Sequence, residues 1–371
     1  MSLSTAHARK PSWLSGGLDL KKVLLEGRAF FALIAITVVF SLLSPNYFTA
    51  DNLLVMSQHV ALYAILAIGM LYVVLNGGID LSVGSTVGLS GVIAGYLLQG
   101  VDLPGGGRAY PSVWVTIVCV LAVGALVGLI NGLLISKYKV APFVATLGML
   151  YAARGVAMLI TDGSTYPELQ GSPAFGNTGF SRVGFDDILG LPAAVIVLAA
   201  LAIVASVVLN KTVFGRRLYA AGGNERAAEL SGIPVKKVKV QVYVFSGLCA
   251  SIAGLILTSE MTSANPNSGQ SYELTTIAAV VIGGASLMGG RGNIRGTLLG
   301  AFVIGFLADG LIIVGVSEYW QMVFKGAVIV LAVVLNAIQY RAKPRAKAAC
   351  ISRGGRPTTQ EPKAPAPAAL P

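Results

Sequence analysis

The chain has 371 residues, of which 55 % are hydrophobic and only 12 % are charged, and its mean hydropathy is +0.75. A soluble domain has about a quarter of its residues charged, so this composition excludes an ordinary soluble protein. The formal net charge of +11 does not indicate nucleic-acid binding, because the lysines and arginines cluster in short segments between apolar runs. We therefore expect a protein that crosses a lipid membrane many times.

Apolar segments recur along the chain at lengths that suit a membrane-spanning helix, which needs about 20 residues for a bilayer core of about 30 Å. About ten such spans are predicted: residues 29–45, 58–76, 81–99, 112–135, 140–160, 191–209, 240–258, 273–289, 296–314 and 319–339. Together they define an all-α transmembrane domain over residues 29–340. Residues 1–28 form an N-terminal segment without a signal-peptide cleavage site, and residues 341–371 form a tail that we expect to be disordered.

The distribution of positive charge predicts how the spans are oriented. With the N-terminus inside, 23 of the 27 lysines and arginines fall in inner segments, whereas only Arg108 and Arg182 fall in outer loops. Cytoplasmic loops are enriched in these residues, and one missed or extra helix would reverse every later assignment. The count therefore favours ten spans with both termini in the cytoplasm.

A polar, glycine-rich stretch, NGGIDLSVGS, interrupts two apolar runs at 76–85. It is either a tight turn, with Asp80 capping the next helix, or a broken helix whose freed backbone groups face a water-filled path. A partial echo, GGASLMGG, occurs at 283–290 and hints at an internal repeat. On the second interpretation, the candidate path residues are Asn76, Gly77, Gly78, Asp80, Ser82, Ser85 and, further along the chain, Asp309.

The inner loop at about 210–239 contains a second feature, a short predicted helix over residues 225–231. Asn224 is a good N-cap, Glu225 suits the positive helix end, and Gly232 is a natural stop. Ala227 and Leu230 fall on one face, at spacing i, i+3. So short a helix is marginal alone, so we expect it to pack on the membrane surface, on this protein's own helices, or on a cytoplasmic partner.

Three ionisable residues, Arg154, Asp309 and Lys325, fall within predicted spans. A charge at the centre of a span costs about 2.5–3.5 kcal/mol on insertion scales. We expect Arg154 and Lys325 to snorkel or to pair with a carbonyl or carboxylate group. Asp309 either lies on a solute path or pairs with one of these cations.

The sequence gives little support for an enzyme. The nearest approach to a phosphate-binding loop, GGRGNIRGT at 289–297, lacks the lysine that reaches the phosphates. The two histidines, His7 and His59, cannot form a catalytic triad together, and the three cysteines form no CxxC pair. We therefore expect no catalytic residue, no cofactor and no metal bound by this chain.

Taken together, these features resemble the permease subunits of bacterial ABC sugar importers of the ribose type, in the branched-chain amino acid/ribose permease superfamily. The resemblance extends from about Asn52 to Ala337. It is carried by GGIDLSVGS at 77–85, APFVATLGML at 141–150, FGRRLYAAGGNERAAELSGIPV at 214–235, YELTTIAAVVIGGASLMGGRGNIRGTLLGA at 272–301 and YWQMVFKGAVIVLAV at 319–333. Relatives often have asparagines near the position of Asp309, so we expect a different specificity if this position faces the path.

The resemblance implies a multi-pass protein of the bacterial inner membrane that imports a monosaccharide by alternating access. It implies three protein partners: an ABC ATPase, often with tandem domains, that uses ATP and Mg²⁺; a periplasmic sugar-binding protein; and a second permease copy, identical or similar. It also implies that the ATPase meets a coupling segment. The residues of that segment are Gly222, Gly223, Asn224, Glu225, Ala227, Leu230 and Gly232.

Two alternatives remain open. The first is an importer of the same superfamily for another cargo, such as a nucleoside, a branched-chain amino acid or a signalling sugar derivative. The second is a secondary transporter or channel that works alone. Its usual sign is a pair of acidic residues in the middle of the membrane, for which Asp309 is the one fair candidate.

Overall fold

The computed structural model of the chain describes residues 27–185, 187–188 and 190–342. The expected N-terminal segment 1–28 and tail 341–371 therefore lie almost entirely outside the described residues. The helices are α2 Arg28–Leu43, α3 Ala50–Leu75, α4 Val83–Gln99, α5 Val113–Ser136, α6 Pro142–Thr161, α7 Arg182–Phe185, α8 Ala193–Lys211, α9 Val213–Gly223, α10 Glu225–Leu230, α11 Val235–Met261, α12 Tyr272–Ile282, α13 Ile294–Ile313 and α14 Glu318–Ala342. One turn of 3₁₀ helix covers Pro173–Phe175.

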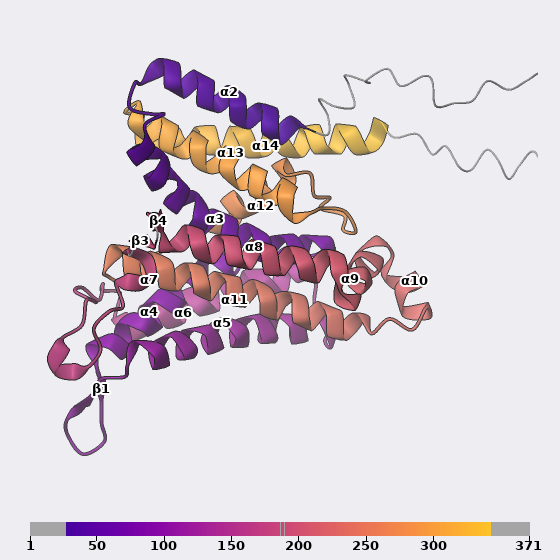
Figure 1. Cartoon of the computed structure of the whole chain (residues 1–371). Helices are drawn as coiled ribbons and strands as arrows, with labels where there is room; N and C mark the ends of the chain where they lie inside the picture. Colours follow the sequence, from indigo (N-terminus) through magenta and orange to yellow (C-terminus); the bar gives the residue numbers. More distant parts are fainter. Residues whose placement is uncertain (1–26, 186, 189, 343–371) are drawn as a thin grey trace, which may run out of the picture.

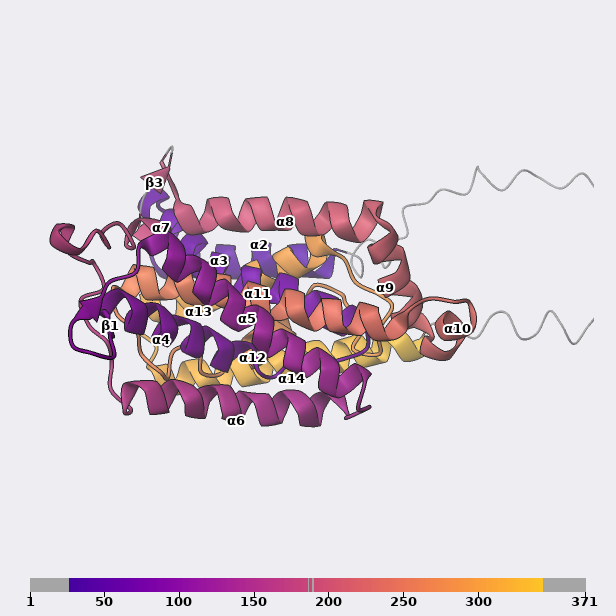
Figure 2. The same ribbon diagram turned by 90° about the horizontal axis from the view of Figure 1, so that it is seen from below.

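The long helices run side by side as a bundle (Figures 1 and 2). One end of the bundle, which we call the strand end, carries α7 and two antiparallel pairs of two-residue strands. These pairs are β1 Val101–Asp102 with β2 Arg108–Ala109, and β3 Asp187–Ile188 with β4 Leu191–Pro192. The opposite end carries α9 and α10. Segments that the charge count assigns to opposite sides of the membrane thus lie at opposite ends of the bundle.

The expectation of a mostly helical membrane protein is confirmed at this level. Within the described residues, six helices are long and apolar enough to cross a bilayer: α3, α5, α6, α8, α11 and α13. Three shorter apolar helices, α2, α4 and α12, correspond to three further predicted spans. The span predicted at 273–289 is longer than the helix observed there, because α12 ends at Ile282, where Gly283 and Gly284 follow.

Helices α3 and α11 form the centre of the bundle. The second half of α3, from Val60 to Leu75, is buried almost throughout, and α11 packs on α3, α4 and α5. The contact of α11 with α5 is close because glycines face each other: a Cβ atom on Gly247 would overlap the carbonyl oxygen of Gly124. Small residues at helix interfaces let backbones approach in lipid, where no hydrophobic force drives helices together.

Candidate functional site

Two short helices, α9 and α10, lie at the end of the bundle opposite the strand end. Thr212 begins α9, since its hydroxyl accepts a hydrogen bond from the amide of Gly215 at 3.4 Å. The buried residues Gly215, Leu218 and Ala221 recur every third position, so one face of α9 packs on the bundle. This helix is not among the elements predicted from the sequence, although Thr212 and that apolar period are its signals.

The predicted helix after Asn224 is present, as α10. The Asn224 side chain accepts a hydrogen bond from the amide of Ala227 at 3.0 Å, which is the expected N-cap. Glu225 pairs with Lys239 at the start of α11, with 2.7 Å between carboxylate oxygen and Nζ. Gly232 has φ of +79°, a conformation that favours glycine, and it turns the chain toward Pro234. The Glu225–Lys239 pair and the short connection through Gly232 thus join α10 to α11.

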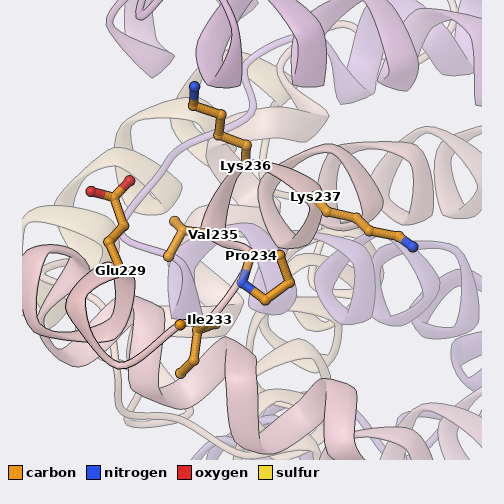
Figure 3. Close-up of a pocket in the computed structure, with 7 residues that line it drawn as sticks. Glu229, Ile233, Pro234, Val235, Lys236 and Lys237 are labelled. Atoms are coloured by element: carbon orange, nitrogen blue, oxygen red, sulfur yellow. The ribbon is translucent and has the colours of Figure 1, made fainter.

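Helix α10 packs on the bundle by a face other than that of Ala227 and Leu230. Ala228 is 5 % exposed and packs with Ala221 and Val235, whereas Ala227 is exposed and Leu230 is 82 % exposed. A large apolar side chain therefore projects from the end of the bundle into solvent. Beside it, a shallow open depression is lined by Glu229, Ile233, Pro234, Val235, Lys236 and Lys237 (Figure 3). The charged ends of these side chains point outward in different directions.

The C-terminus of α9 packs on the ends of both glycine-rich breaks. We call this contact of Leu75, Gly77, Gly222, Gly289 and Gly290 the glycine junction. The amide of Gly290 donates a hydrogen bond to the carbonyl oxygen of Leu75 at 2.8 Å. A Cβ atom on Gly222 would overlap that same oxygen, and one on Gly289 would lie 2.6 Å from the carbonyl oxygen of Gly222. Only glycine allows three backbones to meet this closely.

Tyr219 adds a side-chain tie to the glycine junction. Its hydroxyl donates a hydrogen bond to the carbonyl oxygen of Gly292 at 2.7 Å, and burial raises the pKa of the phenol, so the hydroxyl keeps its proton. Helix α9 is therefore in direct contact with residues 289–292. Of the predicted coupling residues, Gly222 lies in the junction, Gly223 lies at its edge against Gly290, and the others lie outside it.

The stretch 76–85 folds back into the bundle after α3. Asn76 is the C-cap of α3, Gly77 has φ of +78°, and a side chain on Gly78 would overlap the hydroxyl of Tyr243. Ser82 begins α4, and the Ser85 hydroxyl donates to the carbonyl oxygen of Ser82 at 2.9 Å. Helix α4 packs on α5 and α11, and residues 76–82 form a non-helical break between α3 and α4.

Asp80 is buried with its carboxylate hydrogen-bonded on both oxygens. Oδ1 accepts from the amide and the hydroxyl of Ser82, at 3.0 and 2.6 Å, and Oδ2 accepts from the hydroxyl of Ser246 at 2.8 Å. The Asn131 side chain in turn donates to the Ser82 hydroxyl at 2.9 Å. This network joins the start of α4 to α5 and α11. The tight-turn interpretation expects Asp80 to cap α4, and the amide that Asp80 binds is that of Ser82, the residue just before the helix.

Asp309 lies on α13 and pairs with a residue that the sequence argument did not connect to it. His59 Nδ1 lies 3.0 Å from Asp309 Oδ1, with the two side chains 50 % and 10 % exposed. Next to His59, the Gln58 amide donates to Glu260 of α11 at 2.9 Å. Neither Arg154 nor Lys325 pairs with Asp309. No sequence signal indicates this pairing, because the residues are far apart in the chain.

Comparison with known proteins identifies a permease family and several similar sugar permeases. Residues 52–333 match the family described as the permease component of branched-chain amino acid transport systems. The ribose import permease protein of Haemophilus influenzae is 41 % identical over 324 residues, which cover 87 % of this chain and 96 % of the relative. That of Bacillus subtilis is 45 % identical over 308 residues, covering 83 % and 91 %. The Escherichia coli L-arabinose transport permease is 33 % identical, covering 92 % and 98 %. Among solved structures, none matches significantly.

Proposed function

The chain belongs to the family of branched-chain amino acid transport permease components, and on this premise we propose that it is the membrane permease of an ATP-driven monosaccharide importer. The observation that carries the proposal is the 41–45 % identity to ribose import permeases over most of both chains. Xylose, galactose and arabinose permeases are similar at 33–34 % identity, which favours a pentose or hexose over other cargo. Ribose is the first sugar to test.

We further propose ten membrane spans, with both termini and the α9–α10 end in the cytoplasm and the strand end in the periplasm. The charge asymmetry supports this orientation, because Arg108 and Arg182 lie near the strand end, whereas the segment 211–239 carries seven lysines and arginines. Reporter fusions after Gly106 and after Ser231 test it. A periplasmic signal from Ser231 would contradict the orientation.

The proposed partners follow from the chemistry that the chain lacks. Its sequence has no phosphate-binding lysine motif, so ATP and Mg²⁺ belong to a separate ABC ATPase, and this chain binds no cofactor and is not an enzyme. A periplasmic sugar-binding protein delivers the cargo, and a second permease, identical or similar, completes the pore. The ATPase binds at α10, where Leu230 offers an apolar side chain to a cytoplasmic groove.

The proposed mechanism is alternating access. ATP binding draws two ATPase domains together and displaces the α9–α10 pair. Since Gly222 and Tyr219 contact residues 289–292, and Gly290 is hydrogen-bonded to Leu75, that displacement reaches the inner ends of α3 and α13. The pore then opens beneath the loaded binding protein, and hydrolysis resets it. A weak polar path suits this cycle, because a site that binds too tightly does not release its solute.

Deletion of the gene in its own organism tests the cargo. Uptake of labelled ribose, xylose, galactose and arabinose is measured in the deletion strain and after restoration of the gene. We expect loss of uptake of one of these sugars and its recovery on restoration. Unchanged uptake of all four, with loss of uptake of a nucleoside or of leucine, would support the alternative cargo.

A further inference from the structure

Residues 262–271, which we call the re-entrant segment, join α11 to α12 without helix. The segment leaves the strand end, where Ala264 pairs with Tyr166 through a 2.8 Å backbone hydrogen bond. It then descends along α4, so that a Cβ atom on Gly84 would overlap the carbonyl oxygen of Gly269. Gly88, Gly91 and Gly95 give the rest of that face of α4 little bulk.

The descent takes the segment deep into the bundle. Helix α4 ends at the strand end with Gly100 as its C-cap, and Gly84 precedes that residue by a length of about 24 Å at 1.5 Å per residue. A bilayer core is about 30 Å thick, so Gly269 lies well within it. This is why α12 has only 11 residues: it begins at Tyr272, inside the membrane.

Arg154 holds the segment at this depth. Its guanidinium donates hydrogen bonds to the carbonyl oxygen of Pro266 and, at 2.9 Å, to that of Ser268. Within the segment, the amides of Ser268 and Gln270 donate to the carbonyl oxygens of Asn265 and Asn267. Of the alternatives expected for Arg154, snorkelling or pairing with a carbonyl or carboxylate group, the structure shows pairing with carbonyl groups, and they belong to a non-helical backbone.

One side of the segment is buried and the other is polar and exposed. Pro266 and Gly269 are buried against the bundle, whereas Asn267, Gln270 and Ser271 are exposed. Irregular backbone at membrane depth occurs only where protein buries it or where it lines a water-filled cavity. Exposed amide side chains at this depth cannot face hydrocarbon without a large desolvation cost.

We propose that the re-entrant segment lines the water-filled path of the transported solute, and that Asn267 and Gln270 bind sugar hydroxyl groups there. The identity of the solute as a sugar rests on the proposed function, whereas the presence of water in the path does not. A carboxamide offers both donors and acceptors, as does each hydroxyl group of a sugar. Neutral groups on one exposed face give the weak, transient binding that passage requires.

Thiol labelling tests the proposal in the assembled transporter. In a background with Cys119, Cys249 and Cys350 replaced by alanine, Asn267→Cys and Gln270→Cys are treated with a membrane-impermeant methanethiosulfonate from the periplasmic side. The matched control is Leu126→Cys on α5, which is 55 % exposed and lies at a similar depth, about 20 Å from the start of its helix. We expect the two path variants to react about tenfold faster or more, since the reagent needs a hydrated thiolate.

Slow labelling of both path variants would contradict the proposal. If Gln270→Cys and Asn267→Cys react as slowly as Leu126→Cys in a chain that inserts and assembles normally, the segment faces lipid or another subunit and the proposal is wrong. A second measurement uses Gln270→Ala, for which we expect a several-fold rise in the KM of labelled ribose uptake with normal assembly. An unchanged KM would contradict sugar binding by Gln270. If the native chain takes up none of the four sugars, that result counts against the proposed function alone, because the labelling comparison needs no substrate.

Discussion

The carbonyl oxygen of Leu75 accepts a 2.8 Å hydrogen bond from the amide of Gly290, and Gly222 packs directly on that oxygen. Leu75 ends α3, and Gly290 lies in the loop before α13, so two breaks that resemble each other in sequence meet in space. The third partner, Gly222, belongs to the α9–α10 pair. One point of contact thus connects the proposed ATPase-binding helices to two interrupted helices of the bundle.

Gly222→Ala tests the glycine junction. The added methyl group overlaps the Leu75 carbonyl oxygen, and overpacking of this kind costs about 1–3 kcal/mol. We expect the chain to insert in the membrane but to lose most of its transport, measured as labelled sugar uptake per inserted protein. Gly155→Ala on α6, where nothing lies within 4 Å, is the control and should transport normally. Equal uptake by the two variants would remove the junction from the mechanism.

Leu230→Asp tests the exposed end of α10. Because the side chain is 82 % exposed, the substitution should leave folding and insertion unchanged, with a free-energy change of unfolding within about 0.5 kcal/mol. We expect loss of ATPase binding in co-purification and loss of transport. Leu103→Asp, at an exposed leucine in the β1–β2 hairpin of the opposite end, is the control for ATPase binding. Normal ATPase binding and transport by Leu230→Asp would show that α10 is not the coupling site.

His59 and Asp309 form a pair whose energetics a double-mutant cycle can measure. His59→Ala removes the hydrogen-bond partner of a largely buried carboxylate, which should cost about 1–3 kcal/mol of unfolding free energy. Combined with Asp309→Leu, the same change should cost much less, since no buried charge remains. Denaturant unfolding in detergent measures both. Strictly additive effects would show that the pair contributes nothing as a pair.

Asp80 should be far more sensitive to substitution than its partner on α11. Ser246→Ala removes one of three hydrogen bonds and should cost about 1 kcal/mol. Asp80→Ala leaves the Ser82 amide and the hydroxyls of Ser82 and Ser246 without their common acceptor and should cost several times more. The amount of folded protein after membrane extraction and its unfolding midpoint measure the difference. Similar losses for the two variants would contradict a central role for Asp80.

Much of the fold follows from the sequence because the bilayer constrains the chain strongly. Apolar segments of span length and the placement of lysine and arginine indicate a polytopic helical protein, and α3, α5, α6, α8, α11 and α13 lie where spans are predicted. Local capping signals also sufficed for α10, since Asn224 and Gly232 act within one turn of the helix. These features depend on neighbours in the sequence.

Contacts between distant segments could not be predicted in this way. The spacing of apolar residues places Ala227 and Leu230 on one face of α10. It does not predict that Ala228 is the residue that packs on Ala221 of α9 and Val235 of α11. The apolar run at 273–289 reads as one span, although Gly283 ends α12 and the polar segment before it enters the membrane. The sequence does not predict the contact between His59 and Asp309, because it depends on the packing of α13 against α3. Each of these outcomes depends on packing rather than on local pattern.

Reconstitution in liposomes tests the central claim, that this chain is a conduit driven through α10 by a separate ATPase. The purified chain is incorporated alone, with its ATPase, and with its ATPase and its sugar-binding protein, and accumulation of labelled sugar is measured with and without ATP. We expect accumulation only in the complete system with ATP, and its loss when Leu230→Asp replaces the native chain. Accumulation by the chain alone, driven by an ion gradient and without nucleotide, would contradict the claim.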